Sequence, residues 1–260
     1  MSLQRRPFLA LAALFVSTTA LADSALDGVM AKKSITIAIP TDFPPYGFVG
    51  TDMAPQGLDI DMARLIAARL GVAIELVPVT SANRIPYLQT HKADLVISTL
   101  GKNPEREKVI DFTAAYSPFF QAVFAPRTLA LKTPADLAGK TVGVTRGAIE
   151  DMELTKIAPP SADVKRFEDN NATVSAFVSG QVQVIATGAS VAGNMMARNP
   201  QLGTEFKLLL KDSPNFIGVA KGDDKLRGKV NEIIAAAKAG GDIDKLCMKW
   251  LGRPAGELPN

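Results

Sequence analysis

The chain has 260 residues, of which 47% are hydrophobic and 21% charged, and its 29 basic and 26 acidic side chains nearly balance. The basic residues are scattered rather than striped, which excludes a nucleic-acid-binding surface. A single histidine, His91, and a single cysteine, Cys247, exclude a Cys/His metal site and an internal disulfide. We therefore expect no metal and no other cofactor, and Cys247, on an apolar helical face, is expected to be a buried structural thiol.

Residues 1–22 have the layout of a cleaved secretory signal. Arg5 and Arg6 form a positive start, an apolar run follows over residues 8–16, and small residues end the segment. The run is too short for a membrane anchor, which needs about 20 apolar residues. We expect cleavage before Asp23 and export to the periplasm, by the general or the twin-arginine route, which leaves 27 basic against 26 acidic side chains.

The first half of the mature chain alternates β-branched runs with helical patterns, which predicts βαβ units and a mainly parallel sheet. The helix that starts at Asp59 has apolar residues at helical spacing and ends at Gly71. The predicted elements of this half are strands over 34–39, 72–77 and 94–98 and helices over 59–70 and 83–89.

A second series of the same elements begins after Thr133, a natural N-cap that Pro134 follows. It predicts strands over 140–145, 164–167 and 182–186 and helices over 150–157, 171–178 and 191–198. A strand over 215–221 and helices over 224–238 and 242–250 then close the chain. If these helices pack on the first half, the chain crosses between two lobes twice, near 119–123 and 214–218. Two crossings make a hinge, and the ligand is expected between the lobes, at the carboxyl ends of the strands.

Short motifs along the whole mature chain carry a family resemblance. Together they resemble the family 3 extracellular solute-binding proteins, the polar amino-acid receptors of ABC importers. The motifs are Asp42-Phe43-Pro44-Pro45-Tyr46-Gly47-Phe48, Gly57-Leu58-Asp59-Ile60-Asp61, Asn83-Arg84-Ile85-Pro86, Ala93-Asp94-Leu95-Val96, Asn103-Pro104-Glu105-Arg106, Val109-Ile110-Asp111-Phe112, Lys140-Thr141-Val142-Gly143-Val144 and Lys249-Trp250-Leu251-Gly252.

The resemblance implies an α/β fold of the type II periplasmic-binding-protein class, in which two lobes are joined by a two-strand hinge. It divides the chain into lobe 1, residues 23–119 and 217–260, and lobe 2, residues 120–216. It also implies a binding protein rather than an enzyme, with a small carboxylate or amino acid as ligand and a membrane permease as partner. A monomer is expected.

Arg106 is the candidate carboxylate clamp. A carboxylate that leaves water loses several kcal/mol of hydration, and a planar guanidinium returns two hydrogen bonds to it. In the resembling family, the arginine at this point of the motif binds the α-carboxylate of the ligand. Thr99 and Gly101 match positions that offer it hydrogen bonds, although Gly101 has only its backbone. The alternative is an exposed arginine in a charge run.

Other candidates in the first lobe are two aromatic residues, a serine and a second arginine. Phe43 and Tyr46 match an aromatic lip that shields the ligand, with ordinary packing as the alternative. Ser81 and Arg84 resemble the segment of glutamate and aspartate receptors that meets a second carboxylate, so a dicarboxylate would fit. In the alternative interpretation, Arg84 pairs with a structural carboxylate such as Asp111.

The second lobe departs from the family. The turn reads Arg146-Gly147-Ala148-Ile149-Glu150 where the family has Gly-Thr or Gly-Ser-Thr, so the threonine hydroxyl is absent, although the N–H groups at that helix start still attract an anion. Gly188 stands where the family has the aspartate that binds the ligand's ammonium group. Either Glu150 or Asp151 substitutes, or water does, or the ligand lacks that ammonium.

An enzyme is the second hypothesis, because some periplasmic cyclohexadienyl dehydratases resemble this scaffold. In them Glu150 or Asp151 would be the general acid, if burial raised its pKa. The only histidine, His91, is expected at an exposed helix end, so no Ser-His-Asp arrangement is available. We therefore favour binding without catalysis.

Overall fold

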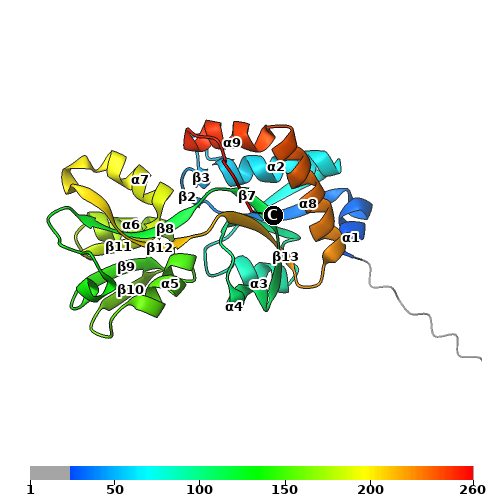
Figure 1. The fold of residues 1–260 in the computed structure, drawn as a ribbon. Coiled ribbons are helices and arrows are strands. Elements are labelled where there is room, and N and C mark those ends of the chain that lie inside the picture. The colour runs from blue at the N-terminus through cyan, green and yellow to red at the C-terminus, as the bar shows by residue number, and fades with distance from the viewer. Residues whose placement is uncertain (1–23, 260) are drawn as a thin grey trace, which may run out of the picture.

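The computed structural model describes residues 24–259 and shows two α/β lobes side by side, joined by two strand connections (Figure 1). Each lobe contains a five-stranded sheet with helices packed against it. Within the described residues, no helix combines the length and the apolar composition needed to cross a membrane. The predicted signal and its cleavage site lie outside these residues.

The sheet of lobe 1 has the order β5-β1-β6-β13-β7. β5 and β6 run parallel to β1, whereas β13 is antiparallel to both its neighbours. The strands are β1 (Ser34–Ile39), β5 (Ala73–Pro78), β6 (Leu95–Leu100), β7 (Ile110–Ser117) and β13 (Asn215–Ala220). The helices are α1 (Ala25–Lys32), α2 (Leu58–Leu70), α3 (Arg84–Gln89), α4 (Pro104–Glu107), α8 (Asp224–Ala239) and α9 (Asp242–Leu251). A small sheet adds β2 (Asp42–Phe43), β3 (Gly47–Val49) and β4 (Pro55–Gln56).

The sheet of lobe 2 has the order β10-β9-β11-β8-β12, parallel over its first three strands and antiparallel after them. The strands are β8 (Phe120–Pro126), β9 (Thr141–Thr145), β10 (Asp163–Phe167), β11 (Val184–Gly188) and β12 (Thr204–Asp212). The helices are α5 (Ile149–Ile157), α6 (Asn170–Val178) and α7 (Ala189–Arg198), with 3-10 turns η1 (Pro134–Leu137) and η2 (Pro200–Leu202).

Two passages of the chain connect the sheets. The chain leaves lobe 1 between β7 and β8, at residues 117–120, and returns between β12 and β13, at residues 212–215. After the return, α8 and α9 pack on lobe 1, against β7 and α2 (Figure 1). We propose lobe boundaries within these passages, at 119/120 and near residue 214, because the expected second boundary at 216/217 falls inside β13, a strand of the lobe 1 sheet.

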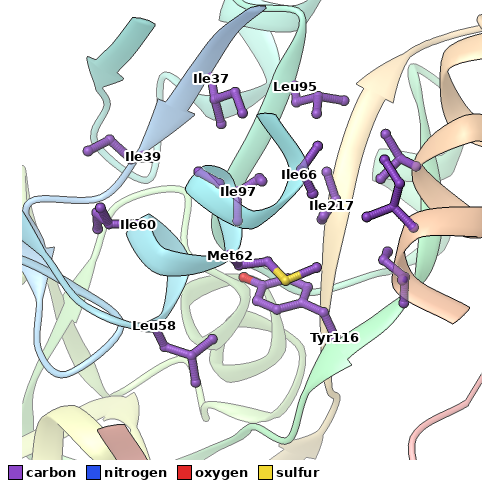
Figure 2. Packing of buried hydrophobic residues seen from close by; sticks show 14 of the residues in the cluster. Ile37, Ile39, Leu58, Ile60, Met62, Ile66, Leu95, Ile97, Tyr116 and Ile217 are labelled. Atoms are coloured by element: carbon purple, nitrogen blue, oxygen red, sulfur yellow. The ribbon is translucent and has the colours of Figure 1, made fainter. Parts of the chain in front are cut away.

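The core of lobe 1 lies between its sheet and α2 (Figure 2). Met62 and Ile66, one helical turn apart on α2, meet Ile37 of β1 and Ile217 of β13, and all four are fully buried. Burying a side chain of this size contributes about 1.5–3 kcal/mol. Cys247 of α9 is buried in the same cluster, where burial raises the pKa of its thiol to about 11, so it is packed rather than reactive. The rigid core fixes the edge of the sheet at which the candidate site lies.

Candidate ligand-binding site

The predicted site residues gather between the lobes, at the carboxyl ends of strands from both sheets. From lobe 1, Thr99 lies near the end of β6, Gly101 follows it, Ser81 and Arg84 lie at the start of α3, and Arg106 lies on α4. From lobe 2, Ala148, Ile149 and Glu150 begin α5, and Gly188 ends β11. Parallel strands present their carboxyl ends at one edge, which explains the convergence.

Arg106 is buried and touches both lobes. The side chain of Asn103 caps α4 by accepting a hydrogen bond from the Arg106 N–H at 2.8 Å, which fixes this one-turn helix. The guanidinium donates to the carbonyl of Gly101 at 2.7 Å and across the cleft to the carbonyl of Gly147 at 2.9 Å. The side chain is 2% exposed, so the interpretation as an exposed arginine in a charge run is wrong.

The charge of Arg106 has no carboxylate beside it. Burial and the positive charge of Arg84 lower the pKa of Arg106 to about 9, and Glu150 only partly offsets them. Its Nε atom has no hydrogen-bond partner among the described residues. A buried guanidinium without an adjacent carboxylate favours the binding of an anion.

Arg84 lies beside it and is 3% exposed. It donates to the Ser81 hydroxyl at 2.7 Å and, at 3.4 Å, to the carbonyl of Thr99. Burial lowers the pKa of Arg84, against the opposing effect of nearby carboxylates. Pairing with Asp111 is wrong, because Lys221 occupies that carboxylate at 2.7 Å.

Thr99 is held in an unusual backbone conformation. Its φ of 42° lies in the left-handed region, which a β-branched residue rarely adopts. Its N–H donates to Asp59 at 2.8 Å, and the Tyr116 hydroxyl donates to the other oxygen of that carboxylate at 2.6 Å. Asp59 and Tyr116 therefore fix the backbone near the carboxyl end of β6. Sequence reasoning missed both residues as site residues, although Asp59 lies in one of the family motifs.

Three aromatic rings form a wall between the lobes. Phe43 lies 5.6 Å from Phe119, centroid to centroid, and Tyr46 lies 5.3 Å from Phe119 in an edge-to-face arrangement. The Tyr46 hydroxyl donates to the carbonyl of Pro118 at 2.6 Å. This bond and the packing account for the burial of Tyr46, and ligand contact by Phe43 and Tyr46 stays a prediction.

Gly188 faces this wall and has no room for a side chain. A Cβ atom at this position would overlap Cζ of Phe119 and lie 3.0 Å from Cζ of Phe43. The place where the family has an ammonium-binding carboxylate is therefore filled by aromatic carbon. A Cβ on Gly101 would likewise press against Ile149, at 3.4 Å.

The two acidic residues at the start of α5 differ in their surroundings. Asp151 accepts a hydrogen bond from Arg166 at 2.8 Å and one from the Gly147 N–H at 3.1 Å, so its oxygens are committed. Glu150 is 2% exposed, and its Oε1 has no partner among the described residues. Burial raises the pKa of Glu150 to about 7, although both site arginines oppose the shift.

The charged site residues, both arginines and Glu150, form no direct ion pairs with other described residues. None of the ion pairs within residues 24–259 includes Arg84, Arg106 or Glu150. In the same part of the chain, no three His, Cys, Asp or Glu side chains are arranged to hold a metal ion. The arrangement is suited to binding a small anion rather than a cation.

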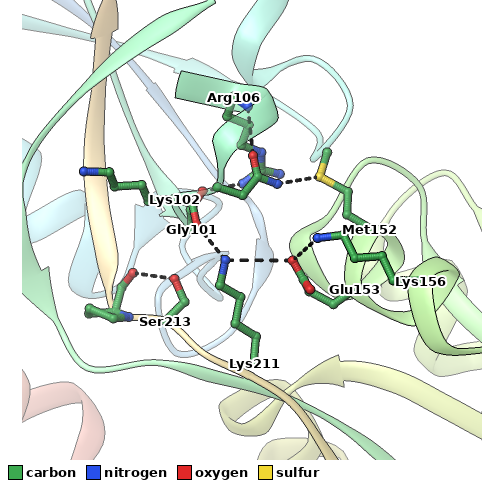
Figure 3. Close-up of polar contacts among 10 residues, drawn as sticks. Gly101, Lys102, Arg106, Met152, Glu153, Lys156, Lys211 and Ser213 are labelled. Atoms are coloured by element: carbon green, nitrogen blue, oxygen red, sulfur yellow. Dashed lines mark hydrogen bonds and ion pairs between the residues drawn. The ribbon is translucent and has the colours of Figure 1, made fainter. Parts of the chain in front are cut away.

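Further polar contacts close the lobes around the site. Figure 3 shows the Asn103 amide donating to the Met152 sulfur at 3.0 Å and Lys211 of β12 donating to the carbonyl of Lys102 at 2.8 Å. On another side, Asp42 accepts hydrogen bonds from the N–H and amide of Asn170, at 2.8 and 3.1 Å. Each contact joins one lobe to the other, so opening the cleft breaks all of them.

Comparison with known proteins identifies the family of the chain. The family model described as bacterial extracellular solute-binding proteins, family 3, matches residues 35–253. The chain is similar to the ABC transporter arginine-binding protein 1 of Escherichia coli strain K12, with 28% identity over 248 residues that cover 93% of this chain and 98% of that protein.

Two solved structures extend the similarity to the fold. A mutant of ArgBP from T. maritima superposes with a TM-score of 0.82 at 30% identity, covering 88% of this chain and all of that one. An ancestral amino-acid-binding protein described as a precursor of cyclohexadienyl dehydratase gives a TM-score of 0.78 at 30% identity, covering 87% of this chain and 99% of that one. The chain belongs to the bacterial extracellular solute-binding proteins of family 3.

Proposed function

We propose that the protein is the substrate-binding component of an ABC importer and captures a small carboxylate-bearing solute, an amino acid or a related acid, by closing its two lobes. The single observation that carries this proposal is Arg106, a buried guanidinium that contacts both lobes and has no carboxylate partner. A ligand carboxylate would supply the missing charge.

The energetics favour closure on an anion. An uncompensated charge buried in protein costs several kcal/mol, and a fork of two hydrogen bonds from a guanidinium to a carboxylate offsets much of that cost. Because Arg106 reaches Gly147 of lobe 2 only when the lobes meet, an anion held there would stabilise the closed state more than the open one. The ligand shifts the equilibrium by that difference.

Other site residues would position the ligand. The first N–H groups of α5 lie opposite Arg106 and favour an anion at the helix start. Thr99, with a hydroxyl that has no protein partner, would add a hydrogen bond from lobe 1. Phe43 would shield the apolar part of the ligand.

Location and partners follow from the same proposal. We expect a monomer in the periplasm, exported with the signal at residues 1–22 and cleaved before Asp23, and a membrane permease that recognises the closed form. The family relationship supports export and delivery to an ABC transporter.

A thermal-shift and calorimetric screen tests the proposal. Amino acids, dicarboxylates and related organic acids are offered to the purified protein. A ligand at 100 times its dissociation constant adds about 2.7 kcal/mol of stability. We expect the largest shift to disappear in Arg106→Met and to persist in the control Arg64→Met, because the Arg64 side chain is 52% exposed on α2. An unchanged shift in Arg106→Met would show that Arg106 is not the residue that binds the ligand carboxylate.

One observation favours an enzyme as a second candidate. Glu150 has a pKa of about 7 in the cleft, which suits a general acid, and one structural neighbour is described as a precursor of a dehydratase. Incubation with prephenate or arogenate, followed by product analysis, tests this function. Turnover that is lost in Glu150→Gln would establish it, and no turnover would leave binding as the function.

A further inference from the structure

Three buried charged groups converge in the cleft, each with an unpartnered atom. Among residues 24–259, no hydrogen-bond partner reaches the Nε of Arg84, the Nε of Arg106 or the Oε1 of Glu150. All three side chains are 2–3% exposed, so water outside the closed cleft does not solvate them. Their unused hydrogen-bonding capacity points to a ligand that makes contact with each.

The two guanidinium groups lie side by side along the end of β6. Arg84 donates to the carbonyl of Thr99 and Arg106 to the carbonyl of Gly101, two residues further along the chain. Two residues of backbone span at most about 7 Å. The carbonyls that accept from the two groups are therefore close together, and the positive charge of Arg84 lowers the pKa of Arg106, so the cleft contains two neighbouring cationic groups, one for each carboxylate of a dicarboxylate.

Protein donors already engage three of the carboxylates near the site. The oxygens of Asp59 accept from Tyr116 and Thr99, and Asp151 accepts from Arg166 and Gly147.

A third carboxylate, Asp42, binds the N-terminus of α6 through Asn170. Asp42 uses only its Oδ2 in these bonds, whereas Glu150 is buried with an Oε1 that has no partner among the described residues, and its raised pKa of about 7 leaves it largely uncharged in mildly acidic solution.

Aromatic carbon blocks the remaining place for an ammonium partner. At Gly188 even a Cβ would overlap the ring of Phe119, and that ring is held between Phe43 and Tyr46. An ammonium in this cleft would face the like charges of Arg84 and Arg106, which is costly in a buried site.

We infer that the ligand is a short dicarboxylate without an amino group, bound by Arg84 and Arg106 against the aromatic wall of Phe43 and Phe119. This inference deepens the proposed function and rests on it. It separates this chain from the relative whose name specifies arginine, because two guanidinium groups repel that cation.

Matched pairs of ligands test the inference by isothermal titration calorimetry at about pH 6, where Glu150, with a pKa of about 7, is largely uncharged. Succinate is compared with L-aspartate and glutarate with L-glutamate, which differ only in the amino group, and L-arginine is added as a cationic ligand. We expect the diacid of at least one pair to bind ten-fold more tightly than its amino acid, and arginine not to bind. Equal or tighter binding of the amino acids, or binding of arginine, overturns the inference.

Glu150→Gln provides a second, independent readout. If Glu150 only adds negative charge beside the bound diacid, the substitution should tighten diacid binding at least three-fold at pH 8. If Glu150 holds an ammonium group, the substitution weakens binding instead, and the inference fails. Tight binding of an amino acid would contradict this inference but not the proposed function. If no carboxylate binds, the proposed function is contradicted as well.

Discussion

Replacing Arg106 with methionine should separate ligand binding from stability. Methionine keeps much of the length and volume of the side chain but removes the charge and the donors. Arg106 now makes two protein hydrogen bonds, to Gly101 and Gly147, in a buried site. If its role is to bind ligand, its loss should abolish binding and leave the free protein nearly as stable.

The magnitudes follow from its surroundings. A pKa lowered from 12.5 to about 9 means that folding disfavours the charged guanidinium of Arg106 by roughly 5 kcal/mol. Two hydrogen bonds from a charged donor return about 1.5–3 kcal/mol each. These terms nearly cancel, so the stability of the ligand-free protein should change by no more than about 2 kcal/mol. Truncating one partner of a buried charge pair costs about 2–5 kcal/mol of binding, or roughly 30-fold to several thousand-fold in Kd.

Denaturant unfolding of the free protein and calorimetric titration with the best ligand measure the two effects. Arg64→Met is the matched control, because its side chain is largely exposed. A variant that binds normally, or one that loses binding only because it has lost several kcal/mol of stability, would refute the reasoning.

Three other substitutions probe the site. Arg84→Met should weaken a dicarboxylate by at least ten-fold in calorimetry and leave a monocarboxylate unaffected; equal losses for both ligands would contradict its proposed role. Asp42→Ala removes the hydrogen bonds to Asn170 across the cleft, so stopped-flow measurements should show that the ligand dissociates about 10- to 100-fold faster. From the control Asp52→Ala, whose side chain is exposed, the ligand should dissociate at the wild-type rate. Asp59 has a folded-state pKa raised to about 7, mainly by burial, from 3.8. The folded state therefore holds this proton more tightly, and its contribution to stability is full below about pH 4 and is lost as pH rises to 7. From pH 4 to pH 7, thermal melts should show the free energy of unfolding of the wild type falling by roughly 4 kcal/mol relative to that of Asp59→Asn. An equal pH dependence in the two proteins would contradict the raised pKa of Asp59.

Local patterns were enough to predict elements whose boundaries are set by nearby residues. The helix predicted over 59–70 is α2, Leu58–Leu70, because its apolar residues recur at helical spacing and Gly71 takes a left-handed conformation that ends it. The predicted strand over 215–221 is likewise β13, which is buried along nearly its whole length.

Other elements depend on contacts that local patterns do not contain. β12, Thr204–Asp212, was not predicted, because an edge strand with charged residues and half-exposed positions lacks a buried run. Thr133 does cap a turn, but η1 spans only residues 134–137 and is 3-10, not a full helix.

The sequence predicted residues of the site but not all of their contacts. The motifs indicated Arg106 and Arg84, and both are buried where the lobes meet. The partner of Arg84 was not predictable from nearby sequence, because Asp111 meets Lys221, 110 residues away. The ring of Phe119 against Gly188 was missed for the same reason, since only the fold brings them together.

A crystal structure of the protein with its tightest-binding ligand tests the central claim most directly. We expect a ligand carboxylate within hydrogen-bond distance of the Arg106 guanidinium, between α4 and the start of α5. A ligand bound elsewhere, with Arg106 making only its protein contacts to Gly101 and Gly147, would contradict the claim.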